Sequence, residues 1–335
     1  MWLAIVVISL ALIFAFSNGF HDAANVVSTI IMTRAISPRK ALLLAGICEF
    51  VAPFFLGAAV ARTIGENIIH VSVRTPNMVI ISASFLIAAL LGAILWNLIT
   101  WFFGLPSSSS HALIGGMVGA VLVAYGPSKI LWGGLLYVVA SLVISPLLGL
   151  IFGMLFLRIT LRIFRNATPK INYFFNRMQI PSSIALALSH GSNDVQKSIG
   201  LIVMAFILLG FSTSFHAPLW VIACCGAATA LGTASGGWKI IKTVGSIYRL
   251  RSVHAFCTQT SSAVVILGAA LAGGPVSTTH VVSSSIMGVG AGERISAVRW
   301  GVAKNIVLAW VVTIPASAVM AGLSFLVIRW LLSYA

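Results

Sequence analysis

This chain consists largely of long apolar stretches with almost no charged residues, and this pattern constrains its fold more than any other feature. Of its 335 residues, 59% are hydrophobic and only 7% are charged, whereas an ordinary soluble domain carries about 25% charged residues. So few charges cannot cover a water-facing surface, and lipid must solvate most of the exterior. Because a membrane-spanning helix needs about 20 apolar residues, the sequence predicts an all-α, polytopic membrane protein with about ten membrane segments.

The apolar segments fall into two sets of five. The first set covers residues 2–31, 41–61, 77–103, 105–126 and 131–157, and the second covers 182–211, 218–238, 255–273, 275–290 and 300–331. A polar linker with five basic residues divides the sets. We therefore predict a first transmembrane repeat at 1–157, a basic cytoplasmic linker at 158–180 and a second transmembrane repeat at 181–335.

Two polar motifs occur in the same order in both halves. They are NGFHDAAN (18–25) with HGSNDVQK (190–197), and PSSSSH (106–111) with PVSTTH (275–280). Asp22 and Asp194 are 172 positions apart, and His111 and His280 are 169 positions apart. Two different motifs repeated at nearly the same offset indicate an internal duplication.

The basic residues indicate how the chain is oriented. If each half crosses the membrane five times and the amino terminus lies outside, fifteen of the twenty Lys and Arg residues fall in cytoplasmic loops and four in outer loops. This bias agrees with the positive-inside rule and argues against nucleic acid as the partner of the +15 net charge. Five is odd, so we predict inverted-topology repeats in the cell membrane, with both termini outside.

Three acidic residues, Asp22, Glu49 and Asp194, lie within apolar segments. A charged group at the membrane centre costs about 2.5–3.5 kcal/mol on insertion scales, so its presence indicates a functional site. Gly19 and Gly191 are poor helix formers, and we predict that the first helix of each half breaks there. The freed carbonyls and nearby side chains would bind a coupling cation, or an Asp would take up a proton instead. The predicted coupling-ion residues are Asp22, Asn25, Asn193, Asp194 and Glu49.

The Ser- and Thr-rich motifs suit the opposite charge. Pro106 and Pro275 favour a helix start, and the amino terminus of a helix offers N–H donors and a positive dipole end to an anion. Two such hairpin-like motifs meeting across the repeat axis would surround a tetrahedral oxyanion. The predicted substrate-binding residues are Ser108, Ser109, Ser110, Ser277, Thr278, Thr279, Gln196 and Lys197. Supporting positions behind them are expected at His21, His111, His190, His280 and Gln259.

These motifs closely resemble those of the inorganic phosphate transporter (PiT) family, in its bacterial form. The resemblance covers nearly the whole chain and rests on SNGFHDAANVVSTI (17–30), LSHGSNDVQKSIGLI (188–202), LGTASGGWK (231–239) and GPVSTTHVVSSSIMGVGAG (274–292). It implies symport of inorganic phosphate, often as a neutral metal complex in bacteria, with protons or sodium ions. It also implies that Asp22, Asn25, Asp194 and the hydroxyl motifs line the site, and that Glu49 matches a glutamate of some members. No resident metal and no organic cofactor are expected.

Two positions depart from expectation. Gln259 stands where the family usually has Glu, which removes one titratable charge. Lys197 occupies the position that Asn25 holds in the first repeat, as it does in other bacterial members that the sequence resembles. We hypothesise that its ammonium either stands in for one coupled cation or contacts the anion directly.

Other functions remain to be weighed. A sulfate permease on the same scaffold is the nearest alternative, but phosphate can donate a hydrogen bond to a buried carboxylate and sulfate cannot. An intramembrane protease using Asp22 with Asp194 is disfavoured because no Gly directly precedes Asp194, so no enzymatic activity is predicted. A passive channel would not need the carboxylates for coupling. A homo-oligomer is compatible with the sequence.

Overall fold

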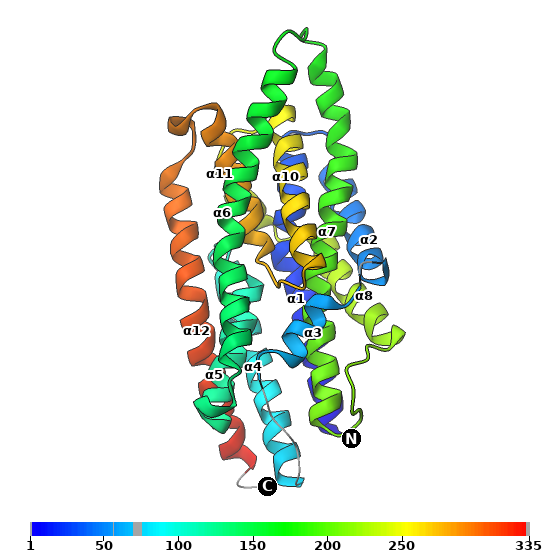
Figure 1. Ribbon diagram of the computed structural model, residues 1–335, viewed down its shortest axis with the longest axis vertical. Coiled ribbons are helices and arrows are strands. Elements are labelled where there is room, and N and C mark those ends of the chain that lie inside the picture. Colours follow the sequence, from blue (N-terminus) through cyan, green and yellow to red (C-terminus); the bar gives the residue numbers. More distant parts are fainter. Residues whose placement is uncertain (1, 56, 70–75, 333–335) are drawn as a thin grey trace.

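The protein is helical throughout, as the computed structural model shows for residues 2–55, 57–69 and 76–332 (Figure 1). The described residues form twelve α-helices: α1 (Trp2–Met32), α2 (Pro38–Phe55), α3 (Ala59–Glu66), α4 (Pro76–Phe102), α5 (Ser109–Tyr125), α6 (Trp132–Ile163), α7 (Ile171–Leu208), α8 (Leu219–Ser235), α9 (Trp238–Gly245), α10 (Ser252–Leu271), α11 (Thr278–Glu293) and α12 (Trp300–Leu332). Two short 3₁₀ turns, η1 (Pro127–Lys129) and η2 (Ile295–Ala297), precede α6 and α12. The predicted all-α, polytopic class is confirmed.

Five helices are long and apolar enough to cross a membrane by themselves, namely α1, α4 from Met78, α6, α10 and α12. Two bent helix pairs, α2 with α3 and α8 with α9, raise that number to seven if each pair is one span. The predicted figure of about ten segments also counts α5, α7 and α11. It therefore stays a prediction.

The most polar helices lie at the centre of the bundle. The second half of α1 and the middle of α7 are buried almost without interruption, including their Asp, Asn, His and Ser side chains. Large apolar side chains are instead exposed along α6 and α12, at positions such as Leu136, Leu147, Val311 and Leu323. An apolar rim around a polar centre suits lipid outside and a solute site inside.

The prediction that the first helix of each half breaks at its glycine is wrong. α1 continues through Gly19, and α7 continues through Gly191. A Cβ on Gly19 would lie 2.1 Å from the carbonyl oxygen of Thr229 on α8. A Cβ on Gly191 would lie 2.7 Å from the Cα of Glu49 on α2. Both glycines therefore permit close helix packing, as small residues do between membrane helices.

The breaks lie in the second helix of each half. α2 and α3 meet at an angle of 77°, and α8 and α9 meet at 69°. Gly236 lies at the second bend, and its φ of +71° falls in the region that favours glycine. These bends direct the chain away from the membrane normal at corresponding places in the two halves.

A sharp reversal precedes each Ser/Thr motif. Gly104 follows α4 with φ +67°, and Gly273 follows α10 with φ +73°. An extended segment then leads to the start of α5 at Ser109 and of α11 at Thr278. The two motifs thus have the hairpin-like form expected from the sequence.

Each half packs its helices against the other half in equivalent pairs, first helix against second helix and fifth against sixth. α1 lies along α8, and α7 lies along α2. In the same way, α5 packs against α12 and α11 packs against α6. Such exchanged pairs are what two interlocked copies of one unit would produce.

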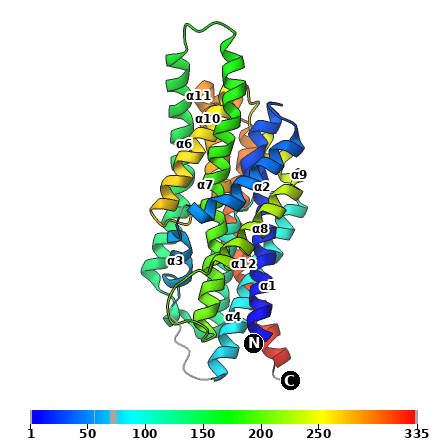
Figure 2. The ribbon, with the colours of Figure 1, turned by 90° about the vertical axis from the view of Figure 1, so that its right-hand side faces the viewer.

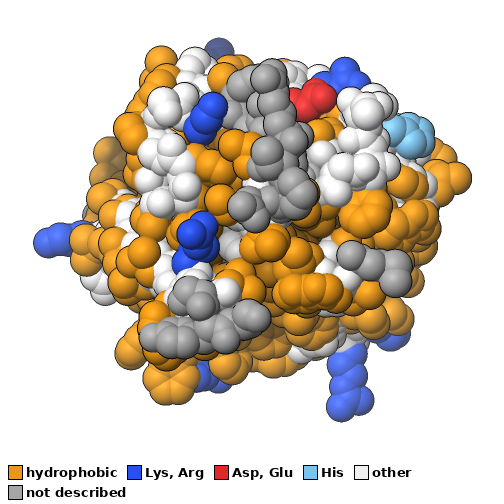
Figure 3. Space-filling model, turned by 90° about the horizontal axis from the view of Figure 1, so that it is seen from below, with side chains coloured by type: hydrophobic (Ala, Val, Ile, Leu, Met, Phe, Trp, Pro, Cys, Tyr) orange, Lys and Arg blue, Asp and Glu red, His pale blue; other side chains and the backbone are white. Residues whose placement is uncertain are grey.

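Both termini lie at the lower end of Figure 1, and the connection between α6 and α7 lies at the upper end, beyond the other helices (Figures 1 and 2). The lower end carries few Lys and Arg side chains among hydrophobic and uncharged polar ones (Figure 3). This placement agrees with an odd number of crossings in each half. That the upper end faces the cytoplasm stays a prediction.

The close contact at Gly19 predicts a loss of stability in Gly19→Ala. The added methyl group would overlap the Thr229 carbonyl, and overpacking of this kind costs about 1–3 kcal/mol. The measurement is the thermal unfolding midpoint of the purified protein in detergent. Gly268→Ala on α10 is the control, because nothing lies within 4 Å of a Cβ there. Equal midpoints for the two variants would contradict the packing role of Gly19.

Candidate functional site

The two carboxylates predicted to meet do lie together inside the molecule. Asp22 on α1 is 1% exposed and Asp194 on α7 is fully buried. One ligand atom from each of Asp22, Asp194 and His190 lies within 4.8 Å of the others. The halves of the chain thus contribute one Asp each to a single buried cluster, which we call the carboxylate cluster, and Glu49 joins it through His190.

Each Ser/Thr motif caps the helix that it starts. The Ser108 hydroxyl accepts a hydrogen bond from the backbone N–H of His111 (3.1 Å), which caps α5. The Ser277 hydroxyl accepts one from His280 (3.2 Å) and caps α11 in the same way. Ser is among the preferred residues for this position. The caps fix the starts of α5 and α11, and so place the next two hydroxyls of each helix.

The first of these hydroxyls points to the carboxylate of its own half. Ser109 on α5 donates a hydrogen bond to Asp22 Oδ2 (2.7 Å). Thr278 on α11 donates one to Asp194 Oδ2 (3.2 Å). The two halves therefore build the same contact from equivalent residues.

The second hydroxyl of each helix makes contact with the other half. Thr279 donates to Asp22 Oδ1 (3.0 Å) and accepts from the amide nitrogen of Asn25 (2.9 Å). Ser110 accepts from Lys197 Nζ (2.5 Å), which also donates to Asp194 Oδ1 (2.5 Å). Each helix start thus bridges the two halves at the carboxylate cluster.

A third carboxylate is linked to the cluster by a histidine. His190 Nδ1 lies 2.9 Å from Glu49 Oε1, and its Nε2 lies 3.3 Å from Asp194 Oδ2. Thr233 donates a hydrogen bond to Glu49 Oε2 (2.5 Å). Glu49, His190 and Asp194 are all fully buried. The cluster therefore combines three carboxylates with one lysine and one bridging histidine.

Several contributing residues carried no signal that the sequence analysis used. Thr100 and Ser107 hydrogen-bond to one another (2.7 Å), and each lies within 3.3 Å of His21 Nε2. Thr100 lies in an apolar helix, and its partners cannot be inferred from the sequence. Thr233 lies in the LGTASGGWK motif (231–239) but was not singled out there. Ser107 belongs to the recognised Ser run, so it could have been included.

The other predicted residues lie around this cluster. His21 contacts Asp22 through Nδ1 (3.2 Å). The rings of His111 and His280 lie in contact behind the helix starts, with centroids 4.4 Å apart and their planes tilted by 35°. Asn193 donates to the carbonyl of Gly274 (3.2 Å). These side chains support the helix starts that carry the hydroxyls.

Two predicted residues are engaged elsewhere. The Gln196 side-chain oxygen accepts hydrogen bonds from the backbone of Val60 and Ala61, and its nitrogen donates to the backbone of Ser192. Gln196 thereby holds the start of α3. Gln259 on α10 is hydrogen-bonded to neighbouring Ser and Thr side chains, Ser182 and Thr29.

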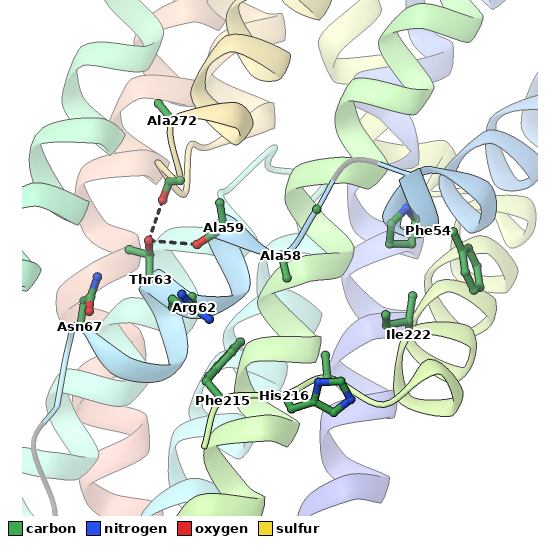
Figure 4. A pocket seen from close by; sticks show the side chains of 14 residues that line it. Phe54, Ala58, Ala59, Arg62, Thr63, Asn67, Phe215, His216, Ile222 and Ala272 are labelled. Carbon is green, nitrogen blue, oxygen red and sulfur yellow. Dashed lines mark hydrogen bonds between the residues drawn. The ribbon is translucent and has the colours of Figure 1, made fainter. Parts of the chain in front are cut away.

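A cavity of about 670 Å³ opens beside α3 (Figure 4). Arg62, Thr63, Phe215 and His216 are among the residues that line it, and the Thr63 hydroxyl donates to the carbonyl of Gly273 (2.8 Å). The carboxylate cluster does not line this cavity. The start of α3 and the turn before α11 both contribute residues to the lining of the cavity.

The sequence matches the phosphate transporter family over residues 18–321. It is 44% identical over 321 residues to a protein of Rhizobium meliloti (strain 1021) named as a probable low-affinity inorganic phosphate transporter, with 95% of this chain and 94% of that protein covered. A protein of the same name from Bacillus subtilis (strain 168) is 42% identical over 331 residues, covering 98% of this chain and 97% of the relative.

A solved structure also has this fold. It is titled "The sodium-dependent phosphate transporter" and is similar with a TM-score of 0.88 at 27% sequence identity. The similarity covers 98% of this chain and 100% of that one.

The buried pair of Lys197 and Asp194 predicts a large stability loss in Lys197→Met. Removing one partner of a buried ion pair costs about 3–5 kcal/mol, because the other charge stays buried. The double variant Lys197→Met with Asp194→Asn should recover part of that loss. Unfolding midpoints in detergent measure both effects.

An ion pair on the protein surface provides the control for this comparison of single and double variants. Arg62 and Glu66 are 65% and 40% exposed and lie 3.5 Å apart, so Arg62→Met should cost no more than about 1 kcal/mol. Equal unfolding midpoints for Lys197→Met and Arg62→Met would contradict the stability loss expected from breaking the buried Lys197–Asp194 pair.

Proposed function

The chain belongs to the phosphate transporter family, and we propose that it is a secondary active symporter that moves inorganic phosphate together with sodium ions or protons. One observation carries the proposal. Asp22 and Asp194, from the two halves, share one buried cluster with the hydroxyl-bearing starts of α5 and α11. Membership in a transporter family sets aside the intramembrane protease considered from the sequence.

Charge balance requires coupling to cations. Phosphate carries one or two negative charges near neutral pH, and Asp22, Asp194 and Glu49 add up to three more in a region closed to water. Burying unpaired charges in a low dielectric is costly. Sodium ions or protons that enter with phosphate would offset these charges, so that only the fully loaded site can reorient.

The residues take different roles in this proposal. The coupling ions are taken up at the carboxylate cluster, where Asp22 and Asn25 offer oxygen ligands, Asp194 is paired with Lys197, and Asn193 and Glu49 lie beside them. The hydroxyls of Ser109, Ser110, Thr278 and Thr279, with the backbone N–H groups of the helix starts, bind the phosphate oxygens. Gln196 is better placed to hold α3 than to bind substrate, because its amide is fully engaged with backbone groups.

The cargo is either free phosphate or a metal–phosphate complex. Ligand atoms of Asp22, His190 and Asp194 lie within 4.8 Å of one another, which suits a cation that arrives with the anion. A protonated phosphate oxygen can also donate a hydrogen bond to a carboxylate, which sulfate cannot do. We therefore favour phosphate over sulfate as the substrate.

Alternating access would use the two halves, 1–157 and 181–335, as inverted repeats joined by the basic linker at 158–180. Exchanged helix pairs and matching bends of 77° and 69° support this division. In transporters with inverted repeats, one repeat rocks against the other around a site near the membrane midplane. Here the carboxylate cluster is that site.

Uptake measurements test the proposed function. Proteoliposomes with the wild-type chain should accumulate radiolabelled phosphate uphill when an inward sodium or proton gradient is imposed, and each gradient is imposed separately. Asp22→Asn and Asp194→Asn should each reduce coupled uptake at least tenfold, because the first removes a charge that the coupling ion neutralises and the second leaves the buried Lys197 ammonium without its carboxylate. Glu66→Gln, at an exposed position, serves as the control and should transport normally.

The same assay separates the alternatives. Sulfate uptake without phosphate uptake would show that sulfate, not phosphate, is the substrate. Phosphate uptake that runs only down the phosphate gradient and does not respond to a sodium or proton gradient would indicate a passive channel. Full activity of either Asp variant would remove that residue from the mechanism.

The predicted orientation calls for a labelling test in intact cells. In a Cys224→Ser background, which removes the one exposed cysteine among four free ones, single cysteines are placed at Asn166 and at Ser128. Ser128, in the η1 turn at the lower end of Figure 1, should react with a membrane-impermeant maleimide. Asn166 in the linker should react only after permeabilisation. The reverse pattern would invert the assigned orientation.

A further inference from the structure

The two halves of the carboxylate cluster share their Asp and hydroxyl contacts but differ in the side chain three residues after each Asp. Asp22 and Asp194 each accept a hydrogen bond from the first hydroxyl of a helix start, Ser109 or Thr278. Three residues after each Asp, however, the first half has Asn25 and the second half has Lys197. Both side chains donate to equivalent hydroxyls, of Thr279 and Ser110. A neutral amide and a cation thus occupy matching places.

The ammonium group of Lys197 is surrounded by oxygen atoms, as a bound metal cation would be. Its Nζ is fully buried and lies 2.5 Å from Asp194 Oδ1, 2.5 Å from Ser110 Oγ and 3.4 Å from the carbonyl oxygen of Val276. An ammonium group has three donors, and these three oxygens account for all of them. This engagement within the cluster favours the tethered-cation role of Lys197 over direct contact with the anion.

Each half has an Asn near its Asp whose buried side-chain oxygen has no partner among the described residues, Asn25 in the first half and Asn193 in the second. They differ in that Asp194 is already paired with the Lys197 ammonium, whereas the described structure places no such cation beside Asp22. Asn25 is 1% exposed, yet its Oδ1 has no hydrogen-bond partner in the described part of the chain. Buried polar atoms are nearly always partnered, and an exception calls for an explanation such as a bound ion. Asn25 Oδ1 belongs to the side chain that donates to Thr279, which in turn donates to Asp22. Oxygen atoms around a carboxylate form a suitable site for a monovalent cation.

We infer that the second half carries its cation permanently, as the ammonium of Lys197, and that only the first half binds an exchangeable one at Asp22 and Asn25. This inference rests on the proposed symport function and specifies its stoichiometry. The wild-type chain then needs one transported cation fewer per phosphate than the same chain with Asn at position 197. A tethered ammonium cannot leave, so Asp194 stays compensated in both the loaded and the empty carrier.

The decisive variant is Lys197→Asn, which gives the second half the residue of the first. We expect the reversal potential of phosphate flux in proteoliposomes to report one additional sodium ion per phosphate. The Hill coefficient for sodium should rise by about one, and uptake at low sodium should fall at least tenfold but recover at high sodium. Lys197→Met offers neither charge nor oxygen, so its uptake should stay low at every sodium concentration.

The mirror variant tests the other site. Asn25→Lys places an ammonium beside Asp22, and the dependence of uptake on the coupling cation there should be lost. Equilibrium binding of radioactive sodium to purified protein gives a measurement that does not need transport. Lys197→Asn should bind one more sodium ion than the wild type.

The outcomes separate this inference from the proposed function. Absence of coupled phosphate uptake in the wild type would refute the symport proposal itself. Coupled uptake in the wild type with an unchanged cation ratio and unchanged sodium binding in folded Lys197→Asn would overturn only the tethered-cation inference. If Lys197→Asn fails to fold, an Asn25→Lys variant that retains the wild-type cation dependence overturns it instead.

Discussion

An ionised carboxylate inside a membrane must be stabilised by an opposite charge or by hydrogen-bond donors. The centre of this protein contains three such carboxylates, and the packing of its helices brings polar partners to each of them. Asp22 contacts Ser109, Thr279 and His21. Asp194 contacts Lys197, Thr278 and His190. Glu49 contacts His190 and Thr233. Most of these donors come from a different helix than the carboxylate that they contact. The contacts around the carboxylates therefore depend on the packing of both halves of the chain against one another.

Glycine makes that convergence geometrically possible. Gly19 brings α1 against the backbone of α8, and Gly191 brings α7 against α2. Because both helices remain continuous, the Asp on each is held at a fixed height and rotation relative to its neighbours. Bends after α2 and α8 and reversals at Gly104 and Gly273 lie in other segments than the two helices that carry Asp22 and Asp194.

The sequence predicted the parts of the site that depend on local patterns. Hydrophobic runs located the helices, the Pro–Ser pattern located the caps, and a constant offset paired Asp22 with Asp194. It failed at Gly19, because a glycine in a helix can mark either a break or a close approach. The deciding atom, the Thr229 carbonyl, lies 210 positions away in the chain. Thr100 and Thr233 were missed for the same reason, since their partners are set only by the tertiary fold.

The difference between Asn25 and Lys197 has a consequence for how coupling is divided between the halves. In a fully symmetric site, both Asp side chains would depend on mobile cations, and the empty carrier would hold two uncompensated carboxylates. With Lys197 in place, Asp194 has a partner at 2.5 Å whether or not substrate is bound, and Asp22 alone lacks a cationic lysine. The duplication therefore supplies the geometry that brings the carboxylates together, while the substitution at position 197 sets how many ions must accompany each anion.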